Sequence, residues 1–149
     1  MEITIETGSI RQLETLVKIE AQCFDQEAFS RQQIAYLLTD YNTITLIAKS
    51  QGDTAGFIIA QIEGQKSNLY GHIITINVLP SFRRNRIGTK MLREIEIILK
   101  QKGITECHLE AREDNLAALE LYQKTGYKKI SLLYNYYGDK HGVSFKKTL

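Results

Sequence analysis

Residues 76–92 read Ile76-Asn77-Val78-Leu79-Pro80-Ser81-Phe82-Arg83-Arg84-Asn85-Arg86-Ile87-Gly88-Thr89-Lys90-Met91-Leu92, and their order decides the fold. An apolar strand ends at the chain's only proline, a basic loop follows, and an amphipathic helix begins. Backbone N–H groups in the first turn of a helix lack partners within the helix, and the helix dipole adds positive potential there. The cations of the loop strengthen that potential. The stretch therefore predicts an anion site that suits a phosphorylated ligand.

The composition is that of an ordinary globular domain. The 149 residues are 43% hydrophobic and 24% charged, with a formal net charge of +2. A chain of this length can bury a sizeable core without disulfides or a metal, so we expect a single domain over residues 1–149. The near-neutral total charge argues against a nucleic-acid partner, because the basic character is confined to the opening stretch.

The cysteines and histidines indicate no metal or disulfide framework. Cys23 and Cys107 lie far apart without paired spacing, which favours free buried thiols. His72 and His141 show no ligand spacing, so we predict no metal site. The N-terminus lacks a basic region followed by an apolar run, and no stretch has the roughly 20 apolar residues that span a bilayer. We expect a cytoplasmic protein without a membrane partner.

The first part of the chain predicts a strand and two helices. Residues 2–7 alternate apolar and polar side chains, as in a strand with one buried face. Ser9 and Ser30 are placed to cap two helices. The loop between these helices carries two aromatic residues, Phe24 and Phe29. These two side chains form either a lid over a site or a plug in the core.

The middle of the chain predicts a meander and a crossover. Residues 43–79 read as three antiparallel strands with turns at 50–53 and 64–68. A helix follows over residues 87–102 and ends before Gly103. The next segment, 104–112, alternates again, and a strand after a crossover helix should lie parallel to the strand before it.

The last part of the chain predicts one more helix and a hairpin. Asp114 or Asn115 caps the helix, Gly126 closes it, and residues 127–149 form the hairpin, interrupted around 138–142. The resulting order is β-α-α-β-β-β-α-β-α-β-β. That order indicates a mixed α/β sandwich and not a doubly wound fold.

Three pieces of the sequence together resemble the GNAT superfamily of acyl-CoA-dependent N-acetyltransferases. They are the loop and helix over 78–92, the strand end over 109–115, and the segment from Ala117 to Tyr127. A later pair, Tyr136-Tyr137, makes the chain look most like the ribosomal-protein alanine acetyltransferase (RimI-like) branch. The resemblance covers essentially the whole chain. It implies an α+β fold with a mostly antiparallel central sheet, a parallel splayed pair in its middle and about four helices.

The basic loop departs from the family pattern at one position. The pattern is Arg or Gln, two free positions, Gly, one free position, then Gly or Ala, whereas this chain has Arg86 in place of the first glycine. The resemblance implies that backbone amides of this loop hold the pyrophosphate of acetyl-CoA, and we expect binding to survive because Arg86 adds a cation. The implied cofactor-binding residues are Ile76, Val78, Arg83, Arg84, Asn85, Arg86, Ile87, Gly88, Thr89, Asn115 and Tyr122.

The resemblance also implies an acid and a base. Acyl transfer to an amine needs a neutral amine, a polarised thioester carbonyl and a protonated leaving thiolate. Glu110 matches the family's general base, which often acts through water, and Tyr122 matches the acid that protonates the coenzyme A sulfur. The N–H of Val78 is the implied oxyanion donor, and Asn115 bonds the pantetheine arm, caps a helix, or does both. From the residues alone, Glu110 can also be a solvated strand carboxylate and Tyr122 a core aromatic, while His108 is either a proton relay or structural.

Four aromatic residues are candidates for the acceptor site. Tyr136 and Tyr137, together with Phe24 and Phe29, resemble the walls that hold a protein N-terminus in RimI-like enzymes, although an ordinary aromatic strand end would read the same way. The RimI-like branch usually has an acidic, alanine-containing stretch after its tyrosine pair. This chain has Lys140-His141-Gly142-Val143-Ser144 instead, so alanine specificity is not implied.

The expected function is acetyl transfer from acetyl-CoA to the α-amine of a protein or peptide N-terminus, by direct attack in a ternary complex. An α-amine, with a pKa of about 8, loses its proton more easily than a lysine amine at about 10.4. A lysine or small-molecule amine acceptor, a non-catalytic acyl-CoA-binding domain and a nucleic-acid binder are the alternatives. We expect a monomer or homodimer.

Overall fold

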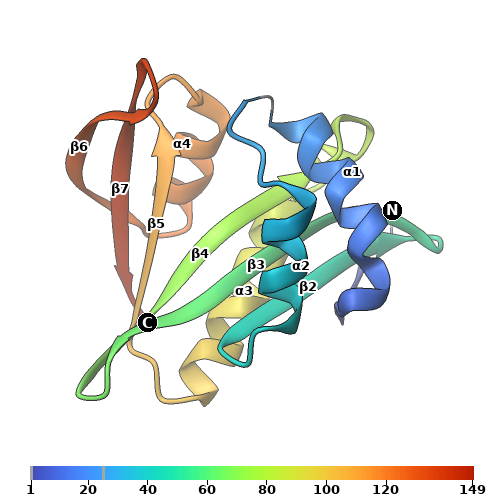
Figure 1. Cartoon of the computed structure of the whole chain (residues 1–149), viewed down its shortest axis with the longest axis horizontal. Helices are drawn as coiled ribbons and strands as arrows, with labels where there is room; N and C mark the ends of the chain where they lie inside the picture. The colour runs from blue at the N-terminus through green and yellow to red at the C-terminus, as the bar shows by residue number, and fades with distance from the viewer. Residues whose placement is uncertain (1, 25) are drawn as a thin grey trace. The chain divides into compact units, whose positions relative to one another are not determined.

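The computed structural model describes residues 2–24 and 26–149 of the chain (Figure 1). Met1 and Asp25, the latter in the predicted aromatic loop, lie outside the described residues. The elements are β1 (Thr4–Thr7), η1 (Ile10–Gln12), α1 (Leu13–Cys23), α2 (Arg31–Thr39), β2 (Thr43–Ser50), β3 (Asp53–Gln65), β4 (Asn68–Val78), η2 (Pro80–Phe82), α3 (Ile87–Gln101), β5 (Glu106–Arg112), α4 (Leu116–Lys124), β6 (Lys128–Tyr137) and β7 (Lys140–Thr148). No helix among the described residues combines the length and the apolar character needed to cross a bilayer.

The strands form one mixed sheet in the order β1-β2-β3-β4-β5-β7-β6. Neighbours pair antiparallel in β1/β2, β2/β3, β5/β7 and β6/β7. The β4/β5 pair is parallel, with Gly71 opposite Cys107 and His72 opposite His108. The mostly antiparallel sheet with a parallel pair is therefore confirmed. The chain divides into two compact units, the first up to Gln61 together with Ile74–Ile95 and the second comprising Ile62–Ile73 and Glu96–Leu149.

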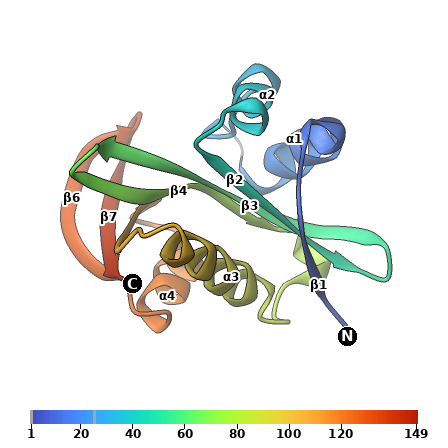
Figure 2. The same ribbon diagram turned by 90° about the horizontal axis from the view of Figure 1, so that it is seen from below.

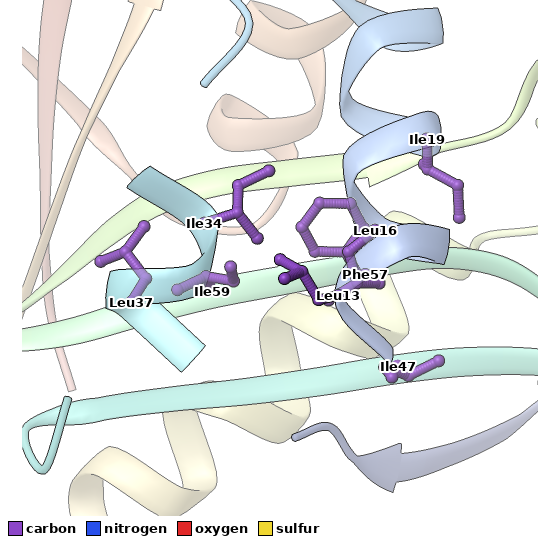
Figure 3. Packing of buried hydrophobic residues seen from close by; sticks show 8 residues of the cluster. All are labelled: Leu13, Leu16, Ile19, Ile34, Leu37, Ile47, Phe57 and Ile59. Carbon is purple, nitrogen blue, oxygen red and sulfur yellow. The ribbon is translucent and has the colours of Figure 1, made fainter. Parts of the chain in front are cut away.

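In the first unit, helices cover both faces of β2 and β3. Helices α1 and α2 lie on one face, and the part of α3 that belongs to this unit lies on the other (Figure 2). Residues 55–60 of β3 are consequently all buried, which is why this strand reads as a continuous apolar run. The cluster under α1 and α2 consists of Leu13, Leu16, Ile19, Ile34, Leu37, Ile47, Phe57 and Ile59 (Figure 3).

Both predicted serine caps are present. Ser9 and Gln12 bond each other's backbone N–H groups reciprocally, and Ser30 and Gln33 do the same at the start of α2. The first helix differs from its prediction, because Ser9 caps a 3-10 turn that only then continues into α1. Ile10 lies in that turn and is 45% exposed, since the 3-10 geometry does not continue the apolar stripe of α1.

The second unit contains β5, α4 and the β6/β7 hairpin. Along β5, Cys107, Leu109 and Ala111 are buried and the residues between them are half-buried, as the alternation predicts. Asn115, not Asp114, caps α4 by accepting the N–H of Ala118 at 3.2 Å. The hairpin between β3 and β4 turns at residues 66–67 and not over 64–68, because backbone pairing continues through its polar residues without any need for apolar side chains.

Candidate active site

In the first unit, the basic loop is held by its own asparagine. The amide nitrogen of Asn85 donates to the carbonyl oxygens of Phe82 at 3.0 Å and Arg83 at 3.1 Å. Two non-glycine residues of the loop, Arg84 and Arg86, have φ angles of 67° and 60°. The loop therefore has a fixed, left-handed path before α3 begins.

Arg86 keeps the backbone conformation that glycine adopts most easily. A φ of 60° costs a residue with a side chain on the order of 1 kcal/mol. The N–H of Lys90 donates to Arg86 O at 3.0 Å, which is the first helical bond of α3. The N–H groups of Ile87, Gly88 and Thr89 therefore belong to the first helical turn, where helices bind anions.

The side chains around this turn divide into core and surface. Ile87 is 1% exposed, so its side chain is part of the core and only its backbone can meet a ligand. Arg83, Arg84, Arg86 and Lys90 are exposed. A fixed loop, free helical donors and exposed cations form a donor set that fits a pyrophosphate.

Val78 ends β4 with its backbone directed away from β3. The next residue, Leu79, donates its N–H to Ala55 O at 2.9 Å, and successive N–H groups of a strand point to opposite sides. The carbonyl oxygen of Val78 accepts from Arg83 Nε at 3.0 Å and Cys23 Sγ at 3.6 Å. This orientation leaves the N–H of Val78 on the side of β4 that faces away from β3, and Ile76 shares its half-buried strand face. The role of this N–H as an oxyanion donor stays a prediction.

A buried carboxylate supports this strand end, and the sequence did not predict its role. Glu20, on α1, is 1% exposed. Its Oε1 accepts from Thr75 Oγ1 at 2.8 Å and Asn77 Nδ2 at 3.1 Å, and its Oε2 accepts from Phe29 N at 3.1 Å. Burial raises the pKa of Glu20, while the three hydrogen bonds oppose that shift. Glu20 therefore ties the aromatic loop to β4.

The two loop phenylalanines differ in their surroundings. Phe29 packs against the core cluster of the first unit, which supports its role as a plug. Phe24 is half-buried, and its N–H donates to Glu20 O at 2.9 Å at the end of α1. A role for either in acceptor binding stays a prediction.

In the second unit, Glu110 is joined to a histidine and a second glutamate. His72 Nε2 lies 2.7 Å from Glu110 Oε1, and His72 Nδ1 lies 2.9 Å from Glu63 Oε2. Burial lowers the pKa of His72, but the hydrogen bonds and charges of the two carboxylates outweigh it and raise the pKa to about 9. Glu110 is therefore not an isolated, solvated carboxylate.

Tyr122 is buried near the same carboxylate. The side chain is 4% exposed and contacts the rings of Tyr127 and Phe145. Burial, and then the charges of Tyr137 and Glu110, raise the pKa of Tyr122. Its phenol stays protonated at neutral pH, as an acid must, although its packing also makes it a core aromatic.

The tyrosine pair lies at the end of β6. The rings of Tyr136 and Tyr137 meet edge-on, with centroids 4.9 Å apart. Burial, and then Glu110 and Glu63, raise the pKa of Tyr136. The structure thus brings both tyrosines into the surroundings of Glu110 and Tyr122.

His108 has partners of its own. Its Nε2 lies 3.2 Å from Glu106 Oε1, and its ring stacks on Tyr70 at 4.2 Å between centroids. These contacts favour the structural reading of His108 over a relay. Among residues 2–24 and 26–149, no group of three or more histidine, cysteine or acidic side chains is arranged to hold a metal.

The sequence reasoning missed His72 and Glu63 as site residues. The two lie nine positions apart on either side of a hairpin turn, so a cross-strand contact was within reach of hairpin geometry. The contact with Glu110 depends on the parallel β4/β5 register, which no turn specifies. Only the structure could bring the three side chains together.

Comparisons with known proteins identify the family. The model of the Acetyltransferase (GNAT) family matches residues 10–127. An N-alpha-acetyltransferase of Sulfurisphaera tokodaii is 34% identical over 111 residues, which cover 68% of this chain and 66% of that relative. The chain thus spans just under two thirds of the length of this curated relative.

Solved structures share the fold. The ribosomal-protein-S18-alanine N-acetyltransferase of Escherichia coli superimposes with a TM-score of 0.87 at 21% identity, over 99% of this chain and 94% of that one. The NAA60 protein of Arabidopsis thaliana, in complex with acetyl-CoA, gives 0.87 at 14% identity, over 99% of both chains. At these identities the likeness concerns the fold alone. The family match over residues 10–127 is the stronger finding, and by it the chain belongs to the GNAT acetyltransferase family.

Proposed function

We propose that the chain is an acetyl-CoA-dependent N-acetyltransferase that acts on the α-amine of a protein or peptide N-terminus, with residues 1–149 working as one catalytic domain. The observation that carries the proposal is that Glu110, which could serve as the base, and Tyr122, a buried phenol that could serve as the acid, lie in the same unit. Burial, and then the charges of Tyr137 and Glu110, raise the pKa of the Tyr122 phenol. Membership of the GNAT family supports the reaction class.

The basic loop would hold acetyl-CoA through its phosphates. The first-turn N–H groups of α3 and the exposed side chains of Arg83, Arg84 and Arg86 provide the donors. Acetyl-CoA supplies the thioester carbonyl that an amine attacks. The N–H of Val78 donates to the carbonyl oxygen.

Residues of the second unit would carry out the proton transfers. Glu110 accepts the proton of the amine, directly or through a water, and the amine nitrogen forms the new C–N bond. Tyr122 donates its proton to the sulfur as the C–S bond breaks. Asn115 caps α4, and its amide nitrogen remains a donor for the pantetheine arm.

An α-amine fits this base better than a lysine does. At pH 7 about a tenth of an α-amine with a pKa of about 8 is already neutral, whereas a lysine amine at about 10.4 is almost fully charged. The N-alpha-acetyltransferase of S. tokodaii, at 34% identity, supports the same acceptor class. The tyrosine pair at 136–137 provides flat, hydroxyl-bearing walls for a peptide backbone. Membership of the RimI-like branch stays a prediction.

A mass-resolved acetylation screen tests the acceptor. The purified chain is incubated with acetyl-CoA and three matched sets: peptides with free N-termini, the same peptides N-blocked but carrying lysine, and polyamines. We expect the acetyl group on the free N-terminus, in a position that fragmentation identifies. Transfer only to lysine or polyamines would refute the acceptor class, and tight acetyl-CoA binding without any transfer would favour a non-catalytic domain.

A cytoplasmic location and a monomeric or homodimeric state are part of the same proposal. Cell fractionation and sedimentation of the full chain test them.

A further inference from the structure

Three side chains form a hydrogen-bonded cluster that runs from Glu63 on β3 through His72 on β4 to Glu110 on β5. All three lie in the second unit. The side chains of His72 and Glu110 are each 21% exposed and that of Glu63 is 29% exposed, so the cluster is largely shielded from water.

The geometry favours a doubly protonated His72 if both carboxylates are ionised. Ionised carboxylates only accept hydrogen bonds, and a neutral imidazole has a single N–H. Nδ1 lies 2.9 Å from Glu63 Oε2 and Nε2 lies 2.7 Å from Glu110 Oε1, so donation to both requires the imidazolium. Hydrogen bonds between charged partners are the stronger class.

The remaining titratable neighbours leave this charge pattern in place. Tyr70, on the same strand as His72, lies with its hydroxyl 3.4 Å from Glu63 Oε1. His108 is opposite His72 in the parallel register but is bonded to Glu106. Tyr136 from β6 responds to Glu110 and Glu63 and keeps its proton, because its pKa is raised. The cluster therefore carries two negative charges and one positive charge.

We propose that Glu63 and His72 are positioning residues for the base: His72, held as a cation by Glu63, fixes Glu110 Oε1 and keeps the carboxylate ionised, so that the other oxygen receives the proton of the acceptor amine. The inference rests on the proposed function and deepens it. Without the cation, Glu63 and Glu110 would repel each other across the vacant position. Glu63 supplies the second charge that keeps a largely buried imidazolium stable.

The first arm of the test does not depend on activity. Nitrogen-15 NMR follows the imidazole of His72 in the ligand-free full chain across pH 5 to 10. We expect both ring nitrogens to stay protonated beyond pH 8, and Glu63→Gln to lower the midpoint by at least one pH unit. The matched control is Glu106→Gln, which removes a glutamate beside a different histidine and should leave the His72 midpoint unchanged. Loss of the His72 proton near pH 6.5 in the wild type would overturn the proposal.

The second arm measures kcat/KM against pH with the best acceptor peptide. We expect His72→Gln to move the acid limb at least one pH unit upward and to lower kcat at least tenfold at pH 7, with acetyl-CoA affinity within twofold of wild type. The double variant Glu63→Gln/His72→Gln should move the limb less than His72→Gln alone, because one of the two repelling carboxylates is gone. A merely structural role would lower activity without moving the limb.

The outcomes separate the two claims. An active wild type whose acid limb is the same in His72→Gln overturns the positioning role and leaves the proposed function standing. Absence of transfer to any acceptor overturns the proposed function and the positioning role together. If His72→Gln fails to fold, the NMR titration and the pH profile of Glu63→Gln test the proposal instead. A His72 midpoint and an acid limb of kcat/KM that are both unchanged in Glu63→Gln refute it.

Discussion

Replacing Glu20 by alanine should lower the free energy of unfolding by about 3 kcal/mol, whereas glutamine should cost only about 1 kcal/mol. The carboxylate accepts three hydrogen bonds, from Thr75, Asn77 and the backbone of Phe29. In the alanine variant the amide of Asn77 still donates to Thr75 Oγ1 at 3.0 Å. The hydroxyl of Thr75 and the N–H of Phe29 lose their acceptor.

The magnitude follows from these two donors. Each buried donor left without a partner costs about 1–3 kcal/mol, and the vacated volume adds to that. Burial disfavours the carboxyl group of Glu20, so its removal offsets part of this cost. The net fall in the free energy of unfolding is then about 3 kcal/mol. A glutamine can accept from Thr75 and Asn77 through its oxygen, but its amide nitrogen then meets the N–H of Phe29, so about one hydrogen bond is lost.

Urea denaturation of the three proteins, followed by circular dichroism at pH 5 and pH 7, measures these values. Because burial raises the pKa of Glu20, the wild type loses stability as pH rises through that pKa, and the glutamine variant does not. The difference between wild type and Glu20→Gln should therefore be smaller at pH 7 than at pH 5. An alanine variant within about 1 kcal/mol of wild type, or a glutamine variant as unstable as the alanine one, would refute the reasoning.

Three further predictions concern single positions. Between pH 6.5 and about 9 the free energy of unfolding should fall by up to about 3 kcal/mol, because the raised pKa of His72 stabilises the fold fully only below pH 6.5. Urea titrations of His72→Gln should lack this part of the pH dependence. The same pH dependence in the wild type and in His72→Gln would contradict the prediction. Gly56→Ala would place a Cβ in the backbone oxygen of Asn77 and 3.1 Å from Val78 Cα. Calorimetry should therefore show that the free energy of unfolding falls by at least about 2 kcal/mol. A wild-type melting temperature would disprove the clash. Arg86→Gly should change the free energy of unfolding by less than about 1 kcal/mol but weaken acetyl-CoA binding by about tenfold in titration calorimetry. An unchanged Kd would show that the Arg86 cation does not contribute to binding.

Local signals predicted the elements well. The two serine caps, the turn around Gly52 and the alternation along β5 are each specified by neighbouring residues, and all three are present. The parallel β4/β5 pair followed from the rule that a strand after a crossover helix lies parallel to the strand before it. The resemblance to the GNAT family is confirmed by the match over residues 10–127.

Contacts that depend on register or burial were not predictable. The bond of His72 to Glu110 needs one specific register of β4 against β5, and the sequence shows only that each residue lies in a strand. Glu20 occupies an apolar stripe of α1, where a carboxylate reads as an exception until Thr75 and Asn77 appear beside it.

The basic loop before α3 was predictable from the sequence only in part. The substitution of Arg86 for a family glycine was visible in the sequence, but its φ of 60° was not. Arg86 has a left-handed conformation that glycine adopts easily, because Asn85 and the start of α3 fix the chain on both sides.

The most direct test of the account is acetyl transfer by three proteins to one peptide with a free N-terminus. Wild type, Glu110→Gln and Tyr122→Phe are compared by mass-resolved initial rates, and acetyl-CoA affinity is measured on the same preparations. We predict transfer by the wild type, a fall in kcat of at least about 100-fold in each variant, and affinities within about threefold of wild type. Turnover by both variants at the wild-type rate would contradict the account.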